Sequence, residues 1–241
     1  MLLRGTFTIA RRELTAFFVT PVGWIVIALF LCLTGFLFAQ GILNLGRPAS
    51  LRPFFEETLI MLFFIAPAIS MRLLAEEHRL GTLESLMTCP VSDGQVVLGK
   101  WVGALAFFVI MLVPTAIYPI VLEIYANPDI GPILTGYLGL IMVGGLYLAF
   151  GALASALWSS QVLAYLLALF FWIGFWAITQ FVPAYVPAPW SELVAWLSVH
   201  GRFASDFGKG VIDLSTVIYL AALTIFFLVT AVKVLESRRW R

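Results

Sequence analysis

One stretch of the sequence matches the start of a phosphate-binding loop. Residues 94–100 follow the spacing G-x-x-x-x-G-K, in which backbone amides and the lysine would hold the phosphates of a nucleotide. The next residue is Trp101, where a serine or threonine should hold magnesium, and no buried strand precedes the motif. Ser92 and Gln95 instead have the spacing of a helix capping box. We therefore predict that this chain carries no ATPase site and binds no cofactor of its own.

The histidines and acidic residues form no catalytic set. His78 and His200 fall on opposite sides of the membrane in the topology derived below, so they cannot share one site. The sequence has no H-E-x-x-H zinc motif, and no carboxylate lies mid-span, where a proton-coupled carrier usually needs one. Glu123 and Asp129 fall at the boundary of a hydrophobic stretch, and we interpret them as solvated helix ends. The pattern predicts no catalytic residue and no metal site.

The composition places the chain in a membrane. Hydrophobic residues make up 62% of the 241 residues, charged residues 11%, and the mean hydropathy is +1.03. A water-soluble domain of this length carries about a quarter charged residues to cover its surface, so the apolar surface here must face lipid. The net charge of +1 gives no indication of a nucleic-acid partner, and we expect none. Cys32 and Cys89 lie far apart, which argues against a disulfide or a cysteine-based metal site.

Charged residues mark the ends of the membrane-spanning helices, because a charge at mid-bilayer costs about 3 kcal/mol or more. The uncharged stretch between Asp129 and Glu192 is long enough for two spans, and we place the break at its polar cluster, residues 155–161. Pro114 and Pro119 predict a kink in the third span. The expected spans are residues 21–42, 53–74, 101–122, 133–156, 162–182 and 214–232.

Residues 1–19 predict a helix of a different kind. Apolar residues such as Phe7 and Phe17 alternate with charged ones, a pattern typical of an amphipathic helix lying in the membrane interface. Pro21 separates this helix from the first span. Its charged residues are Arg4, Arg11, Arg12 and Glu13.

The lysines and arginines indicate the orientation of the chain. With the termini inside, ten of them fall in cytoplasmic segments and four in external ones, a clear positive-inside bias. We therefore predict an all-α integral membrane protein with both termini in the cytoplasm. Residues 1–241 would form a single transmembrane domain.

Two connections between spans are longer than turns. Residues 183–213 form an external segment in which Trp190, Leu193, Val194 and Leu197 follow helical spacing, which predicts a short helix dipping into the outer interface in a re-entrant-like way. Residues 75–100 form a charged cytoplasmic loop.

The cytoplasmic loop combines an apolar stripe with charge. Leu80, Leu83 and Met87 fall at i, i+3 and i+7 on one side of a predicted helix, which Pro90 ends. Such a helix is suited to dock in a groove of a partner protein, but a solvated loop lying on the membrane explains the same pattern. The flanking polar residues are Glu76, Glu77, Arg79 and Glu84.

Aromatic and small residues allow further interpretations. The aromatic runs at 63–64 and 170–172 either line a pathway for an apolar substrate or pack against lipid, the commoner case. Pairs of small residues four apart allow close helix contacts. These pairs are Gly99/Gly103, Gly145/Ala149 and Gly151/Ser155.

At the cytoplasmic loop the sequence resembles the ABC-2 family of transporter permeases. That family runs from its second span into R-x-x-A-E-E-x-x-x-G-T-L-E-x-L-x-x-x-P-V-S and begins its next span near G-K. The tail, residues 211–215 and 235–241, is similar to the branch containing gliding-motility permeases and the permease of nitrous-oxide-reductase maturation. The residues that carry the main resemblance are Arg72, Ala75, Glu76, Glu77, Gly81, Thr82, Leu83, Glu84, Leu86, Pro90, Val91, Ser92, Gly99 and Lys100.

The resemblance implies a permease subunit in a bacterial cytoplasmic (inner) membrane, of the exporter or mechanotransmitting type. Two copies of a separate ATPase subunit would bind ATP and magnesium, and the permease would pair with a second permease, either itself or a related chain. Membrane lipid surrounds such a complex, and an extracytoplasmic auxiliary protein is a further expected partner. The competing hypotheses are a stand-alone secondary carrier or channel and a membrane-embedded enzyme.

The resemblance also implies residue roles. The loop would be a coupling helix seated in the ATPase through Glu76, Glu77, Arg79, Thr82, Leu83, Glu84, Leu86 and Met87, with Pro90 helping to set its angle to span three. The N-terminal helix would be the family's elbow helix, with Arg4, Arg11, Arg12 and Glu13. Spans one, two and five would line the central pathway through Gln40, Phe63, Phe64, Phe171 and Trp172.

Overall fold

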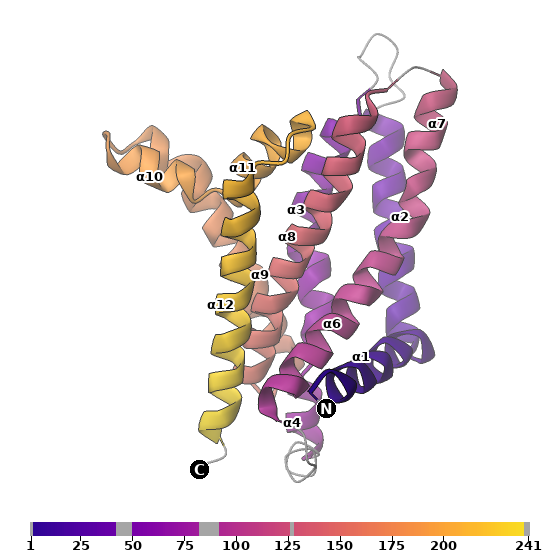
Figure 1. The fold of residues 1–241 in the computed structure, drawn as a ribbon, viewed down its shortest axis with the longest axis vertical. Helices are drawn as coiled ribbons and strands as arrows, with labels where there is room; N and C mark the ends of the chain where they lie inside the picture. Colours follow the sequence, from indigo (N-terminus) through magenta and orange to yellow (C-terminus); the bar gives the residue numbers. More distant parts are fainter. Residues whose placement is uncertain (1, 42–49, 82–91, 126–127, 239–241) are drawn as a thin grey trace.

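The computed structural model describes residues 2–41, 50–81, 92–125 and 128–238, and every regular element in these ranges is a helix (Figure 1). Six helical segments within them are long and apolar enough to cross a membrane, as predicted. They are α2 (Pro21–Gly41), α3 (Arg52–Ser70) with α4 (Ala75–Leu80), α6 (Asp93–Leu112) with α7 (Ile117–Tyr125), α8 (Ile130–Leu157), α9 (Gln161–Phe181) and α12 (Leu214–Arg238).

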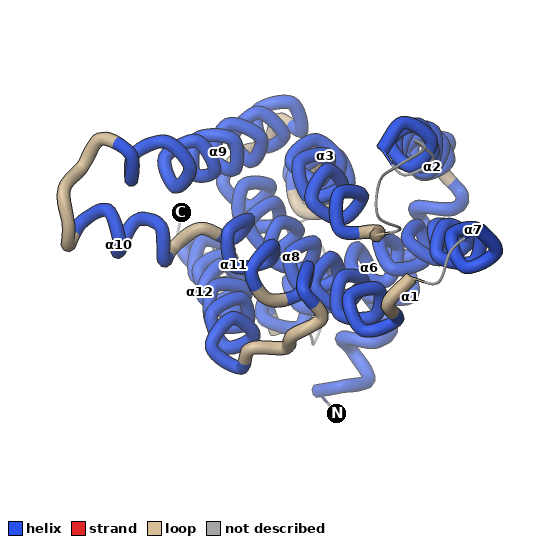
Figure 2. The backbone as a smooth tube through the Cα atoms, turned by 90° about the horizontal axis from the view of Figure 1, so that it is seen from above, coloured by secondary structure: helices blue, strands red, loops and turns tan. Residues whose placement is uncertain are grey.

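Helix α8 is the centre of the bundle. In its most apolar window 83% of the residues are buried, against 22% in α2, α9 and α12. Viewed from above, α3, α6, α9 and α12 surround it (Figure 2). Rings from three elements lie directly on α8 where it has glycine: Phe55 on Gly136, Phe203 on Gly139 and Phe108 on Gly144. A Cβ at Gly139 would lie only 2.6 Å from the Phe203 ring, so these glycines let aromatic rings reach the helix backbone.

The third span is interrupted at a proline. A 3₁₀ turn, η1 (Val113–Ala116), separates α6 from α7 and contains Pro114. Proline has no N–H to donate, so the α-helical ladder cannot run through it. Thr115 and Tyr137 supply local hydrogen bonds: the Thr115 hydroxyl donates to Leu112 O at 2.7 Å, and the Tyr137 hydroxyl donates to Thr115 O at 2.9 Å. Pro119 lies in the first turn of α7.

Helix α1 (Leu2–Val19) crosses the end of the bundle at a steep angle to the spans (Figure 1). The chain turns sharply into α2 at Thr20, and the Trp24 indole donates to Phe18 O at 2.8 Å across this corner. A Cβ at Gly23 would overlap the Phe17 carbonyl, so the corner requires glycine there.

Helix α1 packs against α6 through two glycines. A Cβ added at Gly99 would lie 2.8 Å from the Ile9 side chain, and one at Gly103 would lie 2.8 Å from Ala10 O. The small-residue pair predicted from the sequence therefore does permit a close contact, and its partner is the N-terminal helix. Gly151 similarly lies against the Ser70 side chain, where a Cβ would overlap it.

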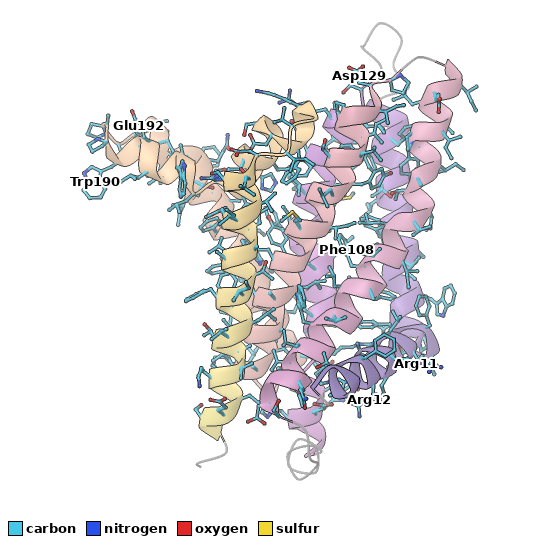
Figure 3. The ribbon with its side chains drawn as sticks, viewed as in Figure 1. Arg11, Arg12, Phe108, Asp129, Trp190 and Glu192 are labelled. Carbon is cyan, nitrogen blue, oxygen red and sulfur yellow. The ribbon has the colours of Figure 1, made fainter. Side chains whose placement is uncertain are left out.

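The segment between α9 and α12 contains η2 (Val182–Ala184), α10 (Trp190–Trp196), α11 (Val199–Ser205) and η3 (Phe207–Lys209). Helix α10 projects sideways from the bundle, with Trp190 and Glu192 near its tip (Figure 3). Arg202 joins this segment to α12: its guanidinium lies 3.9 Å from the Trp196 ring and 4.7 Å from the Tyr219 ring, and its Nε donates to Trp196 O at 2.8 Å.

The helix expected through Leu80, Leu83 and Met87 is not continuous. Helix α4 ends at Leu80 because Gly81 adopts a left-handed conformation with a φ of 68°, and the Gly81 N–H donates to the Glu77 and His78 carbonyls. Glycine adopts this conformation without steric cost and commonly ends helices in this way. The helix that contains Leu80, the first residue of the expected stripe, therefore ends at that residue. Residues 82–91 lie outside the described residues.

We predict that Gly103→Ala destabilises the protein by about 1–3 kcal/mol, because the added methyl group meets backbone that must move. Thermal unfolding in detergent measures the effect. Gly94→Ala is the matched control on the same helix: nothing lies within 4 Å of its added Cβ, so we expect no loss of stability. Equal losses in both variants would contradict a tight α1–α6 contact.

Candidate functional site

Two parts of the predicted 75–100 loop are described. Residues 92–100 belong to the start of α6, which begins at Asp93 and not at the predicted residue 101. The other part is α4, which follows α3 after a four-residue turn, Met71–Leu74. Glu76 and Glu77 occupy its first turn, and Arg79 is exposed in its last turn. Acidic residues at the start of a helix and a basic residue at its end both complement the helix dipole. The remaining candidates lie outside the described residues: Thr82, Leu83, Glu84, Leu86, Met87 and Pro90.

Four charged side chains meet where α1, α4 and α6 come together, and we call Arg12, Glu13, Glu77 and Lys100 the polar junction. The Lys100 Nζ lies 2.7 Å from Glu13 Oε1 and 2.9 Å from Glu77 Oε1. The Arg12 Nη2 lies 3.2 Å from the same Glu77 oxygen and 3.4 Å from Glu13 Oε1. One lysine thus joins a residue of the N-terminal helix to a residue of the loop.

Burial makes this junction energetically important. The Lys100 side chain is 3% exposed and each glutamate 14%, whereas Arg12 is 55% exposed. A buried ammonium must have opposite charges and hydrogen-bond acceptors around it, because its desolvation costs several kcal/mol. The two carboxylates provide them, and the two positive and two negative groups sum to zero. Glu77 Oε2 is buried without a hydrogen-bond partner among the described residues.

Ser155 of α8 forms hydrogen bonds with the backbone at the break between α3 and α4. Its Oγ accepts hydrogen bonds from the N–H groups of Leu74 and Ala75, both at 2.8 Å, and donates to Met71 O at 3.0 Å. These backbone groups lose their helical partners at the break, and in an apolar surrounding unpaired ones would cost several kcal/mol. One side chain therefore satisfies the turn and ties α4 to the central helix.

Arg72 connects the same turn to the α1–α2 corner. Its guanidinium lies 4.0 Å from the centre of the Phe17 ring, and its Nη1 donates to the Thr20 hydroxyl at 3.1 Å. A cation over an aromatic face gains about 0.5–2 kcal/mol, depending on its exposure. The α3–α4 turn thus contacts α8 and the α1–α2 corner. Helix α4 itself is joined to α1 and α6 through Glu77 and to α8 through the Ala75 N–H.

The other candidates for the elbow helix lie at the same end of the molecule. Arg11 is exposed on α1, near Arg12 in Figure 3. Arg4 lies in the first turns of α1, and its side chain is outside the described residues.

The five candidate pathway residues lie in three different surroundings. Phe63 and Trp172 are buried against Tyr147, with ring centroids 5.7 and 4.1 Å from the Tyr147 ring. Phe171 stacks on Phe150 at 3.9 Å. Phe64 is 48% exposed on the outside of α3, and Gln40 lies at the end of α2. The structure brings Phe63 and Trp172 together through Tyr147, and a pathway role for all five stays a prediction.

His200 is a partly buried ring at the opposite end of the bundle. Its ring centroid lies 5.3 Å from that of Phe63 and 6.2 Å from that of Trp176. Burial lowers the pKa of His200 to about 4, because the apolar surroundings disfavour its charged form. Its Nε2 has no hydrogen-bond partner among the described residues.

Sequence reasoning missed the roles of Lys100 and Ser155. The sequence pattern places Lys100 at the end of the cytoplasmic loop and Ser155 in the polar cluster between two spans, and neither placement predicts their contacts. The predicted capping box is confirmed: Ser92 and Gln95 form it at the start of α6. A lysine at the start of an apolar run requires a counter-charge, so Lys100 could have been flagged. Its partner could not, because Glu13 lies 87 residues away.

A family model described as ABC-2 family transporter protein matches residues 49–202, more than half of the chain. The chain belongs to the ABC-2 family. Permeases of this family are membrane subunits without an ATPase site of their own, and they normally work with a separate ATPase subunit. No curated protein is a significant match. The family and the six apolar segments together make this permease a multi-pass membrane protein.

We predict that Lys100→Met destabilises the permease by about 3–5 kcal/mol, because Glu13 and Glu77 stay partly buried without their shared cation. Adding Glu13→Gln and Glu77→Gln should recover part of this loss. Unfolding in mixed detergent micelles measures both. The control is Lys233→Met, which breaks the exposed pair with Glu236 and should cost less than about 1 kcal/mol. A loss no greater than that of the control would refute a structural role for the junction.

We predict a pH-dependent stability that originates at His200. The folded state takes up the His200 proton only near pH 4, whereas the unfolded chain takes it up near pH 6.5. The contribution is therefore complete above pH 6.5 and is lost, by up to about 3 kcal/mol, as the pH falls towards 4. The His200→Phe variant keeps an aromatic ring and cannot be protonated. Its stability should fall less over this range than that of the wild type, and parallel profiles would contradict the assignment.

Proposed function

We propose that this permease couples ATP hydrolysis by a separate ATPase to a conformational change across the membrane, as an exporter or a mechanotransmitting subunit. Two ATPase copies would bind ATP and magnesium, and a second permease, self or related, would complete the complex. The observation that carries the proposal is α4, a short charged helix outside the apolar part of the bundle that is attached to α1, α6 and α8. A force applied to α4 reaches the spans through these contacts.

The placement of the ends supports the proposed orientation. The start of α1, the end of α12 and α4 all lie at one end of the bundle, and α10 lies at the other (Figure 1). Lysines and arginines are concentrated at the first of these ends, as expected for cytoplasmic segments. We propose that this end faces the cytoplasm and that the membrane is a bacterial inner membrane.

The ATPase would contact the exposed part of the loop. Glu76 and Arg79 of α4 and the residues after Gly81 are the proposed contact, with Glu77 turned inward to Lys100. Arg11 and Arg12 on the neighbouring elbow helix α1 would extend this surface. The proposed contact residues beyond Gly81 are Thr82, Leu83, Glu84, Leu86 and Met87, followed by Pro90.

The projecting helix α10 fits a role at the outer face. Trp190 and Trp196 are 64% and 58% exposed, and such rings favour the membrane interface. With the tail similarity to permeases of gliding motility and of nitrous-oxide-reductase maturation, we propose an extracytoplasmic auxiliary protein as a further partner.

The test is ATP hydrolysis by the permease co-purified with its ATPase. Charge reversal in Arg79→Glu and in Glu84→Arg should reduce permease-dependent ATPase activity at least tenfold, because both would disturb the same docking surface. Arg79→Glu should lower the melting temperature of the isolated permease only slightly, since Arg79 is exposed, makes no ion pair among the described residues, and loses only a helix-end interaction of about 0.3–1 kcal/mol.

The matched control is Glu192→Arg, an exposed charge reversal on α10 at the far end of the bundle. It should leave ATPase activity unchanged. Full activity in both loop variants, or transport by the permease alone in liposomes, would rule out coupling through this loop.

A further inference from the structure

A cavity of about 410 Å³ opens at the end of the bundle opposite the polar junction. It lies between the first turns of α3, the last turns of α9 and helix α11. Its volume is at the lower end of the range for small-ligand pockets. The residues that give it chemical character are Glu56, Glu57, Ile60, Trp176, Gln180 and His200.

The two carboxylates of the cavity differ in their pairing. Glu56 Oε1 accepts from Arg52 Nε at 2.9 Å, so that charge is balanced within α3. Glu57 forms no ion pair or hydrogen bond among the described residues, although it is only partly exposed. The cavity therefore carries one negative charge that no described residue neutralises. A half-buried carboxylate favours a cationic partner.

The other residues that line the cavity are suited to a ligand that has an apolar part next to a positive charge. The Trp176 and His200 rings meet at 6.2 Å in an edge-to-face arrangement, and Ile60 extends the apolar wall. An indole face attracts cations, most strongly where water is excluded. The buried His200 Nε2 and the exposed Gln180 amide add polar contacts that no described residue uses.

We propose that this cavity binds an amphipathic organic cation, a primary ammonium or guanidinium group on a short apolar body. The cation would lie against Glu57 and the Trp176 ring, and the apolar part against Ile60. A metal ion is disfavoured, because no group of three histidines, cysteines or acidic residues in the described ranges is arranged to hold one. The binding requires no ATPase, so its test is independent of the coupling proposed above.

The experiment measures protection of a cysteine placed in the cavity wall. Ala204→Cys is made with Cys32 and Cys89 replaced by serine, and the permease is reconstituted in uncharged phosphatidylcholine nanodiscs. Methyl methanethiosulfonate, a small neutral reagent, modifies the thiol, and mass spectrometry gives the rate. Three compounds are tested as ligands that could slow this modification. Phenethylamine represents a free organic amine, and N-acetyl-arginine N-methylamide represents an arginine side chain of another protein. Phenethyl alcohol, which has the same apolar body without a charge, is the neutral control.

We expect at least one of the two cations to slow modification saturably, by fivefold or more, while the alcohol does not. Glu57→Gln should abolish this protection, and Glu192→Gln, a neutralised carboxylate outside the cavity, should leave it intact. Gln180→Glu should lower the half-saturating concentration about tenfold by adding a second carboxylate. Protection by the arginine compound alone identifies a protein-borne cation, and protection by phenethylamine identifies a free amine.

Several results would overturn the proposal. These are absence of protection by both cations, equal protection by the alcohol, and protection that survives Glu57→Gln. A thiol that stays unreactive before any addition would show that the cavity is closed to small molecules, and this too would overturn the proposal. The elution volume in size-exclusion chromatography and the melting temperature identify a variant that fails to fold. If Glu57→Gln does not fold, the proposal is tested by Gln180→Glu instead, and an unchanged half-saturating concentration in that variant would overturn it.

Discussion

The burial of a single ammonium group, that of Lys100, organises one end of this molecule. An almost fully buried cation beside an apolar span is stable only with carboxylates around it, and its two partners come from α1 and α4. Glu13 can reach Lys100 only if α1 approaches α6 closely, and Gly99 and Gly103 remove the side chains that would prevent this. The angle of α1 across the bundle and the position of α4 both depend on this requirement.

The second constraint is the backbone. Helix α3 must stop before α4 begins, and the N–H and C=O groups released at that break lie among buried residues. A single hydroxyl, that of Ser155, forms hydrogen bonds with three of them. Together the ammonium and the hydroxyl fix the position of α4 relative to α1, α3, α6 and α8. The opposite end is built differently, with aromatic rings around Arg202 and an acidic cavity beside His200.

The features that could be predicted from the sequence are those set by residues close to one another in the chain. The six spans follow from where charges are absent, and the capping box of α6 follows from two residues three positions apart. The apolar stripe from Leu80 onwards predicts a continuous helix, whereas α4 ends at Leu80 because Gly81 adopts a positive φ, which the spacing of apolar residues does not reveal. Lys100 with Glu13, and Ser155 with Leu74, are separated by more than 80 residues, so no local pattern reveals them. The cavity near Glu57 is equally a product of three helices that meet in space.

The polar junction also has a consequence for the order in which this protein is made. Glu13 leaves the ribosome 87 residues before Lys100. At about 5–20 residues per second, this gap lasts about 4–17 seconds. During that interval Glu13 has Arg12 beside it in the sequence, but its main partner Lys100 has not yet been made. The contact between α1 and α6 therefore cannot be completed before the first residues of the third span have been synthesised.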